Sequence, residues 1–312
     1  MSVLICTLNR PSLLARSLCA LVISAQQKPD QVIVVNGGDD ETDEVVEPFV
    51  GFRDMDVKLV KTVNKNLAAS RNVGLPHCQG DIIAMTDDDA EVFPDWIAQM
   101  KRAHCEHPEA GAVGGPVLGT NTDSLVGKIA EVITFPSWLA PRYVRTLPGV
   151  NISYKREVVE KIGPQDENLF RGEDVDYNAR VQEMGYKVYF DPAIQVHHYH
   201  RPTFKGLLNQ HYMYGRAYYL VRRKWPEMYC VYPHELRRPK DFLKAINFVG
   251  SLLYQPFLSA RQVPFWGERM AAVPLLFLAG LSWKGGMVAQ ACRGFLAAQG
   301  AAAARTTEPF SS

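Results

Sequence analysis

The chain has 312 residues, which corresponds to roughly two structural units at about 150 residues per domain. Its composition, 47% hydrophobic and 21% charged, is that of a globular protein and excludes a wholly disordered or fibrous chain. Lysine and arginine number 34 against 33 acidic residues, and this net charge of +1 disfavours nucleic-acid binding, which usually goes with a large basic excess. The carboxylates nevertheless concentrate in the first 180 residues, whereas the last hundred are basic, aromatic and then apolar.

Short apolar runs alternate with amphipathic segments through the first half of the chain. The predicted strands are 3–7, 31–36, 57–62 and 81–86, and the helices predicted between them are 12–24, 42–49 and 67–75. Strands that are apolar throughout and separated by helices are typical of a parallel sheet covered on both faces. We therefore predict an α/β fold with a Rossmann-like, mostly parallel central sheet flanked by helices.

The second half continues with similar elements and then changes character. The predicted elements are a helix over 94–108, an extended segment over 111–118, strands over 150–154 and 188–190, and a helix over 174–184. After Arg201 the pattern is helical only, with aromatic and basic residues interleaved. We expect an α/β domain over residues 1–200 and an α-helical C-terminal region over residues 201–312.

The two ends of the chain and its cysteines bear on compartment. Residues 2–6 are strand-like and lack a basic segment followed by an apolar core, so we expect no cleaved signal peptide. The six cysteines are dispersed and mostly flanked by apolar residues, which predicts reduced, buried thiols in a cytoplasmic protein. They are Cys6, Cys19, Cys78, Cys105, Cys230 and Cys292.

Polar residues follow several of the predicted strands. Parallel sheets bind ligands beyond the carboxyl ends of their strands, so these residues are candidates for a binding site. They are Thr7, Asn9 and Arg10 after the first strand, Asn36 and Asp40 after the second, and Asp87, Asp88 and Asp89 after the strand at 81–86.

The three adjacent aspartates are the sharpest local signal. Mg²⁺ and Mn²⁺ prefer oxygen ligands, and one or two carboxylates with substrate phosphates commonly complete their coordination. Strand alternation would place Asp87 and Asp89 on one side as a D-x-D pair. A solvated acidic loop or a helix cap is the alternative interpretation.

Acidic residues and histidines later in the chain also have two interpretations each. Glu173 and Asp174 open a predicted helix, where carboxylates either interact with the helix dipole or supply a general base for an acceptor hydroxyl. His197, His198 and His200 follow a strand-like segment and are either solvated imidazoles or metal ligands.

A polar group precedes Gly74. Capping explains Asn66 at the start of the helix predicted at 67–75, but it does not explain Arg71 in an otherwise neutral segment. A guanidinium at this position could pair with a diphosphate.

Taken in order, these segments resemble the family 2 glycosyltransferases of the GT-A fold. The resemblance covers about residues 1–225, and six modest motifs in the right order make it specific. The matching segments are TLNR at 7–10, NLAASRNVG at 66–74, DDD at 87–89, GVN at 149–151, FRGEDVDYNAR at 170–180 and PAIQVH at 192–197.

The resemblance implies an inverting transfer of a sugar from a nucleotide-diphosphate donor to an acceptor hydroxyl, assisted by a divalent metal ion. The donor-binding residues that it implies are Thr7, Asn9, Arg10, Asn36 and Asp40 at the base and ribose, with Asn66, Arg71, Asp87 and Asp88 toward the diphosphate and ribose. It also implies Asp89, Asp87 and His197 at the metal, with His198 and His200 as alternatives, Asp174 as general base, and Glu173 for positioning the acceptor. The sequence departs from the family at Asn36, where an aspartate is usual, and in the Gly-Gly-Asp-Asp loop after it.

The C-terminal region resembles the helical tails of family members that work at membranes. Tryptophans among basic and proline-interrupted apolar segments suit a bilayer interface, and uncharged stretches of 16 and 14 residues fall short of the ~20 residues of a spanning helix. We expect a peripheral protein at the cytoplasmic face of the cell membrane that acts on a lipid-linked or surface-polysaccharide glycan. Packing on the catalytic domain, or oligomerisation through these helices, is the alternative.

Two other functions remain open at this point. A sugar-phosphate nucleotidyltransferase would use the same sheet, but it requires a glycine-rich basic loop that residues 7–11 do not provide. A non-catalytic membrane-associated adaptor would use the basic helices alone.

Overall fold

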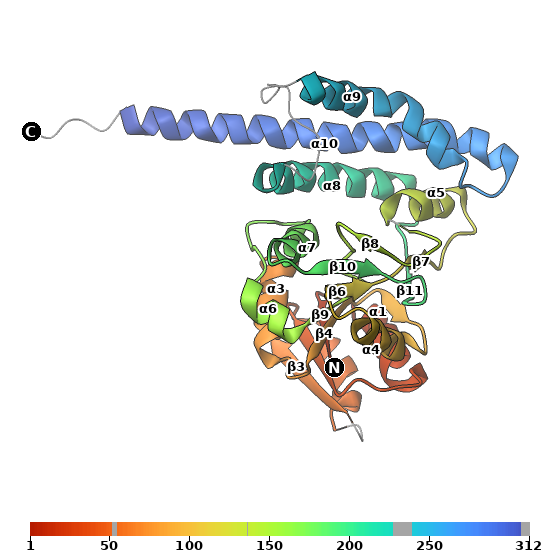
Figure 1. Ribbon diagram of the computed structural model, residues 1–312, viewed down its shortest axis with the longest axis vertical. Helices are drawn as coiled ribbons and strands as arrows, with labels where there is room; N and C mark the ends of the chain where they lie inside the picture. Colours follow the sequence, from red (N-terminus) through yellow and green to blue (C-terminus); the bar gives the residue numbers. More distant parts are fainter. Residues whose placement is uncertain (52–54, 136, 227–238, 307–312) are drawn as a thin grey trace, which may run out of the picture. The chain divides into compact units, whose positions relative to one another are not determined.

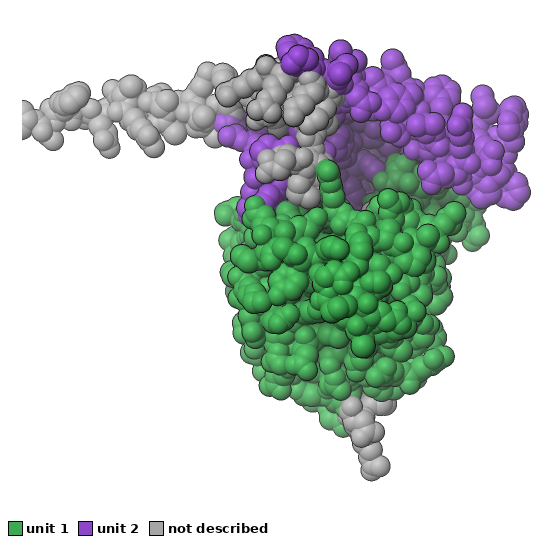
Figure 2. Space-filling view, viewed as in Figure 1, with its two compact units in different colours: residues 1–200 green, residues 201–312 purple. Residues whose placement is uncertain are grey.

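The computed structural model describes residues 1–51, 55–135, 137–226 and 239–306 (Figure 1). The chain forms two compact units, Met1–His200 and Arg201–Ser312 (Figure 2). The first is an α/β unit and the second consists of helices, and each is described by itself.

The first unit is built on an eight-stranded sheet of order β3-β2-β1-β4-β9-β6-β10-β8. β9 runs antiparallel to both of its neighbours and β8 is antiparallel to β10, while the other pairs are parallel, as the sequence predicts. The strands are β1 Ser2–Thr7, β2 Gln31–Asn36, β3 Asp56–Lys61, β4 Ile82–Asp87, β6 Ala110–Gly114, β8 Arg142–Val144, β9 Ile152–Lys155 and β10 Lys187–Phe190.

Helices cover both faces of this sheet, and alternation along the strands divides the core between the faces. Val3 and Ile5 of β1 join the cluster that includes residues of α1 and α4, whereas Leu4 joins the cluster with Tyr177 of α7. Burial on both faces explains why β2 is apolar almost throughout. The helices are α1 Pro11–Leu18, α2 Thr42–Val46, α3 Leu67–Gly74, α4 Trp96–Glu106, α5 Leu125–Thr134, α6 Arg156–Ile162 and α7 Glu173–Glu183.

Several predicted boundaries are corrected by the structure. The helix predicted over 12–24 is divided into α1 and a π-helical segment, Cys19–Ser24. The extended segment predicted over 111–118 is two strands, because β6 ends at Gly114 and β7 occupies Val117–Gly119 in a second sheet. That second sheet has the order β5-β11-β7, with β5 at Ala90–Val92 and β11 at Val196–His198.

The second unit contains α8 Phe204–Lys224, α9 Pro239–Ala260 and α10 Trp266–Thr306, with α10 packed against both of the others (Figure 1). α8 and α10 approach closely at glycines: a Cβ on Gly215 would lie 1.8 Å from the carbonyl oxygen of Trp283. Among the described helices, the stretch Trp266–Gly294 is long and apolar enough to cross a membrane. The sequence argument from uncharged stretches alone did not predict it, because Lys284 interrupts this helix.

The five described cysteines are free, but their burial differs from the prediction. Cys78 is buried and Cys6 is half-buried, whereas Cys19, Cys105 and Cys292 are exposed because they lie on the outer faces of helices. Cys230 lies outside the described residues.

Candidate active site

Only Asp87 of the three aspartates belongs to a strand, so the argument that strand alternation pairs Asp87 with Asp89 was wrong. β4 ends at Asp87, and Asp88 and Asp89 form a turn before β5 begins at Ala90. The three side chains consequently make three different sets of contacts.

Asp88 is a buried carboxylate that ties the turn to the end of β1. Its Oδ2 accepts a hydrogen bond from Thr7 Oγ1 at 2.8 Å, and its Oδ1 accepts one from Arg10 Nη1 at 3.2 Å. Burial, together with the charge of Asp89, raises the pKa of Asp88 to about 6, while Arg10 and Thr7 oppose the increase. The structure thus brings Thr7 and Arg10 to the aspartate turn, and Asp88 shapes that turn.

Asp89 lies between a cation and an imidazole. Arg10 Nη1 is 3.2 Å from Asp89 Oδ2, and His198 Nε2 is 3.3 Å from Asp89 Oδ1. The neighbouring His197 packs its ring against Phe93 with 4.7 Å between ring centroids. Because residues alternate along β11, the side chain that meets Asp89 in this way is His198, the alternative to the predicted His197.

The spacing of Asp89 and His198 can be compared with the spacing of two ligands on one divalent cation. Two ligands at right angles on one Mg²⁺ ion lie about 3 Å apart for a metal–oxygen distance of about 2.1 Å, which the Asp89–His198 spacing of 3.3 Å matches. Among the residues that the structure describes, no group of three or more His, Cys, Asp or Glu side chains could hold a metal by itself. Asp89 and His198 could therefore supply two ligands to a divalent cation.

Asp87 faces a different partner, the guanidinium of Arg71. Arg71 Nη2 lies 3.3 Å from Asp87 Oδ1, and Nη1 lies 3.1 Å from Glu173 Oε1. The Arg71 side chain is only 2% exposed, so protein acceptors surround its charge. Burial and the charge of Asp174 raise the pKa of Glu173, and the Arg71 cation opposes that increase.

Asp174 stands in the first turn of α7 and bonds outside its own helix. Its Oδ2 accepts the N–H of Gly149 at 3.0 Å, and its Oδ1 accepts the N–H of Val175 at 2.8 Å. Gly172, which precedes the helix, has φ of +78°, a left-handed conformation that favours glycine. Helix capping alone therefore does not account for Glu173 and Asp174, since both carboxylates contact other segments.

The residues predicted to bind the base and ribose of the donor form hydrogen bonds with other residues of the chain. Buried Asn36 donates to Asp43 Oδ1 at 2.8 Å and accepts the N–H of Gly38 at 2.7 Å. Asn9, with φ of +52°, accepts the N–H of Asp39 at 3.3 Å, and Asp40 accepts the N–H of Thr42 at 3.2 Å. Nucleotide binding by Asn9, Asn36 and Asp40 stays a prediction.

Asn66 caps α3, as its position suggests, and also reaches the segment before α7. Its Oδ1 accepts the N–H of Ala69 at 2.9 Å, and its Nδ2 donates to the carbonyl of Glu167 at 2.8 Å. A role for Asn66 in donor binding stays a prediction.

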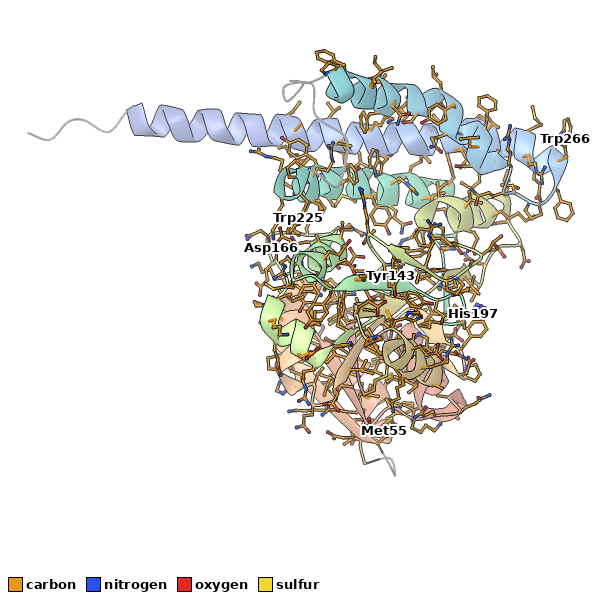
Figure 3. The ribbon with its side chains drawn as sticks, in the orientation of Figure 1. Met55, Tyr143, Asp166, His197, Trp225 and Trp266 are labelled. Atoms are coloured by element: carbon orange, nitrogen blue, oxygen red, sulfur yellow. The ribbon has the colours of Figure 1, made fainter. Side chains whose placement is uncertain are left out.

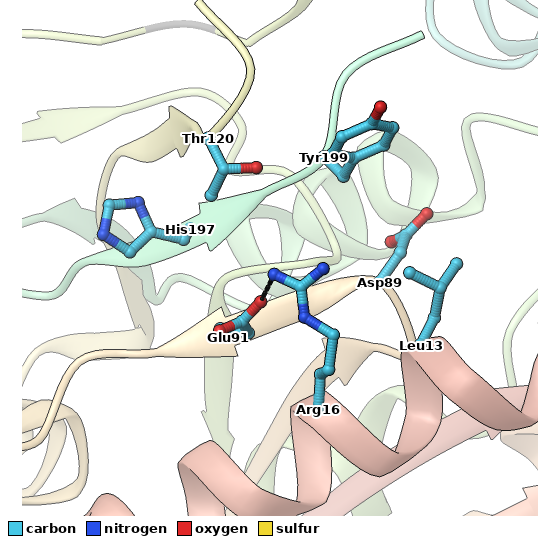
Figure 4. Close-up of a pocket in the computed structure, with 7 residues that line it drawn as sticks. All are labelled: Leu13, Arg16, Asp89, Glu91, Thr120, His197 and Tyr199. Atoms are coloured by element: carbon cyan, nitrogen blue, oxygen red, sulfur yellow. Dashed lines mark hydrogen bonds and ion pairs between the residues drawn. The ribbon is translucent and has the colours of Figure 1, made fainter. Parts of the chain in front are cut away.

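A small pocket adjoins Asp89 on the side of the second sheet (Figure 4). Arg16 and Glu91 form an ion pair across it, and Tyr199 contributes an aromatic ring. Its lining residues are Leu13, Arg16, Asp89, Glu91, Thr120, His197 and Tyr199.

Two contributions to this region were not predicted from the sequence. Gly149 takes part through its backbone, and its position in the GVN segment was the only available signal. Glu131 Oε2 lies 2.8 Å from His200 Nε2, and nothing in the sequence of α5 identifies Glu131 as a partner of a histidine. His200 is thereby held by Glu131, whereas His198 is the histidine beside Asp89.

Curated relatives of this chain are named as glycosyltransferases. A relative from Haloferax volcanii named glucosyl-dolichyl phosphate glucuronosyltransferase is 27% identical over 252 residues, covering 72% of this chain and 78% of its own. A relative from Methanococcus voltae, a dolichyl N-acetyl-alpha-D-glucosaminyl phosphate 3-beta-D-2,3-diacetamido-2,3-dideoxy-beta-D-glucuronosyltransferase, is 23% identical, covering 54% of this chain and 56% of its own.

Solved structures show the fold. A mannosyltransferase from Pyrobaculum calidifontis in complex with GDP-Man and Mn²⁺ superposes with a TM-score of 0.60 at 18% identity, covering 91% of this chain and 86% of that one. The sheet with its flanking helices is the GT-A fold, as the sequence resemblance implied. The model of Glycosyl transferase family 2 matches residues 2–163, more than half of the chain. The chain therefore belongs to glycosyl transferase family 2 and is a transferase enzyme.

Proposed function

We propose that the protein is an inverting glycosyltransferase that moves a sugar from a nucleotide-diphosphate donor to a hydroxyl of a lipid-linked glycan. The observation that carries the proposal is the guanidinium of Arg71, which bonds both Asp87 of the aspartate turn and Glu173 beside Asp174. Through this guanidinium the aspartate turn, proposed to hold the diphosphate, is joined to the residue that precedes the proposed base.

In this mechanism Asp174 is the general base. Its carboxylate takes the proton of the acceptor hydroxyl while the oxygen attacks the anomeric carbon from the face opposite the leaving nucleoside diphosphate, which inverts that carbon. Asp89 and His198 would hold Mn²⁺ or Mg²⁺ with Asp87 nearby, and the ion would neutralise charge on the leaving diphosphate. Glu173 holds Arg71, and we assign the donor to the aspartate turn with Thr7 and Arg10.

Transfer assays with purified protein and a panel of nucleotide-sugars test this mechanism. We expect Asp174→Asn to lower kcat by about 10²- to 10⁴-fold, because it removes the base. Asp89→Ala should weaken Mn²⁺-dependent binding of a nucleoside diphosphate, measured by calorimetry, and EDTA should do the same to the wild type. Asp81→Asn is the matched control, since the Asp81 side chain is 98% exposed.

Wild-type turnover in both site variants would contradict the assignment of base and metal ligand. Release of pyrophosphate from a nucleoside triphosphate would favour a nucleotidyltransferase instead.

The second unit supports a membrane location for this activity. Along α9 one exposed apolar stripe recurs every three or four residues, with side chains 52% to 69% exposed: Phe242, Ile246, Val249, Leu253 and Phe257. Trp266, at the start of α10, is 74% exposed (Figure 3). Aromatic and aliphatic side chains in such an arrangement suit the bilayer interface, where a lipid-linked acceptor would be found. We assign the stripe to the cytoplasmic face of the membrane.

Vesicle flotation tests this location. The double variant Val249→Ser with Leu253→Ser should reduce binding to anionic phospholipid vesicles at least about tenfold, because each buried aliphatic side chain contributes about 1.5 kcal/mol or more. Leu139→Ser is the control, since Leu139 is fully exposed in the first unit. If the wild-type protein forms a stable dimer and does not bind vesicles, the stripe packs between subunits instead.

A further inference from the structure

We propose that Arg71 and Gly149 are positioning residues that hold the proposed base, Asp174, in register with the aspartate turn. This inference rests on the proposed function, since it assigns Asp174 the role of base. Arg71 donates hydrogen bonds to Glu173, Asp87 and Gly149 and acts on Asp174 through Gly149.

The guanidinium of Arg71 joins three segments that are far apart in the sequence. Nη1 donates to Glu173 Oε1 at 3.1 Å, and Nη2 donates to Asp87 Oδ1 at 3.3 Å and to the carbonyl oxygen of Gly149 at 3.2 Å. A planar guanidinium presents its donors in a fixed fork, so its acceptors are held at fixed angles to one another. A lysine would supply the charge but not this fork.

Gly149 passes the constraint on to the base. Its carbonyl oxygen accepts from Arg71, and its N–H donates to Asp174 Oδ2 at 3.0 Å. A Cβ on Gly149 would lie 2.7 Å from Arg71 Nη1 and 2.8 Å from Nη2, so a side chain here would push the guanidinium away. An alanine here would therefore shift the guanidinium, and with it the contacts that join the aspartate turn to the base.

The helix that carries Arg71 also holds the segment leading to α7. Asn72 donates through Nδ2 to the carbonyl of Gln165 at 2.9 Å, and the N–H of Gln165 donates to Asn72 Oδ1 at 2.7 Å. Asn66 bonds the carbonyl of Glu167 in the same segment. Asn66 and Asn72, which lie on either side of Arg71 in the sequence, are thus bonded to the segment before α7, and these bonds hold the helix that carries the guanidinium.

Kinetics of single and double variants test the inference. Displacing a catalytic group by about 1 Å can cost about 100-fold in rate, so we expect Arg71→Lys and Gly149→Ala each to lower kcat by about that factor. The KM for the donor and the affinity for a nucleoside diphosphate with Mn²⁺ should change by less than kcat does, because Arg71 also bonds Asp87 of the aspartate turn but acts on the reaction through the base. Arg156→Lys, on a half-buried arginine paired with exposed Asp81, is the control.

The decisive measurement is a double-mutant cycle. If Arg71 acts through Asp174, Arg71→Lys should lower kcat little further in an Asp174→Asn background, because the base is already lost. Additive losses, or a donor KM that rises in step with the fall in kcat, would overturn the positioning role.

The outcome of the cycle is separable from that of the proposed function. If the wild type transfers sugar but the losses in kcat of the two variants are additive, only the positioning role is contradicted. If the wild type transfers no sugar from any donor, both the positioning role and the proposed function are contradicted. If Gly149→Ala does not fold, Arg71→Lys still decides between these outcomes.

Discussion

We expect Asn151→Ala to be among the most destabilising single changes in the first unit. The Asn151 side chain is fully buried, its Oδ1 accepts from Trp96 Nε1 at 2.8 Å, and its Nδ2 donates to the carbonyls of Pro116 at 2.9 Å and Ile194 at 2.8 Å. Each buried partner left unsatisfied costs about 1–3 kcal/mol. The carbonyl of Pro116 keeps a second bond from the N–H of Val196, so the loss there is smaller.

The three contributions sum to about 2–7 kcal/mol, a large part of the 5–15 kcal/mol that stabilises a typical protein. For a unit of this size the Tm should fall by about 10 °C, measured by circular dichroism at fixed pH. Asn168→Ala is the matched control, because Asn168 is exposed and its side chain bonds Asp166, two residues earlier in the same loop. If Asn151→Ala melts within 2 °C of the wild type, the three bonds do not hold the loops together as argued.

Two further changes probe other parts of the molecule. Burial lowers the pKa of His104 to about 3, so its contribution to stability is present above the unfolded pKa of about 6.5 and is lost as pH falls toward 3. His104→Gln should flatten the acid side of the stability curve by up to about 1.4 kcal/mol per pH unit, and unchanged curves from urea titrations between pH 4 and 7 would contradict this. Gly215→Ala should lower the Tm of the helical unit because a Cβ there meets the Trp283 carbonyl, whereas Gly250→Ala, with nothing within 4 Å, should raise or preserve it. Equal effects of the two alanines would rule out close helix packing at Gly215.

The sequence predicts the strands of the main sheet well because their pattern is local. β1 and β2 are buried on both faces, so apolar residues run continuously along them and polar residues mark their ends. The second sheet could not be predicted in this way, since β5, β7 and β11 are three residues long each and β11 pairs with β5 across more than a hundred positions. Pairing at that separation depends on the assembled fold and leaves no periodicity to detect.

The same distinction applies to the candidate site. The aspartate turn and the pair Glu173–Asp174 stand out because carboxylates gather at the ends of elements. The contacts of Arg71 could not be predicted, because Glu173 is 102 positions away and the side chain turned out to be almost completely buried. Which of His197 and His198 contacts Asp89 depends on the register of β11 against β5, which the paired strands determine and a single sequence does not.

The antiparallel strand β9 has a consequence for the order in which the molecule forms. β1 to β4 pair through successive short crossovers, but the free edge of β4 receives its partner only after the chain has been made as far as Ile152, which lies opposite Met85. Until then β4 presents unpaired N–H and C=O groups that invite association with other chains. During synthesis the first half of the protein therefore passes through a stage with an open edge, which closes when β9 pairs with β4 and β6.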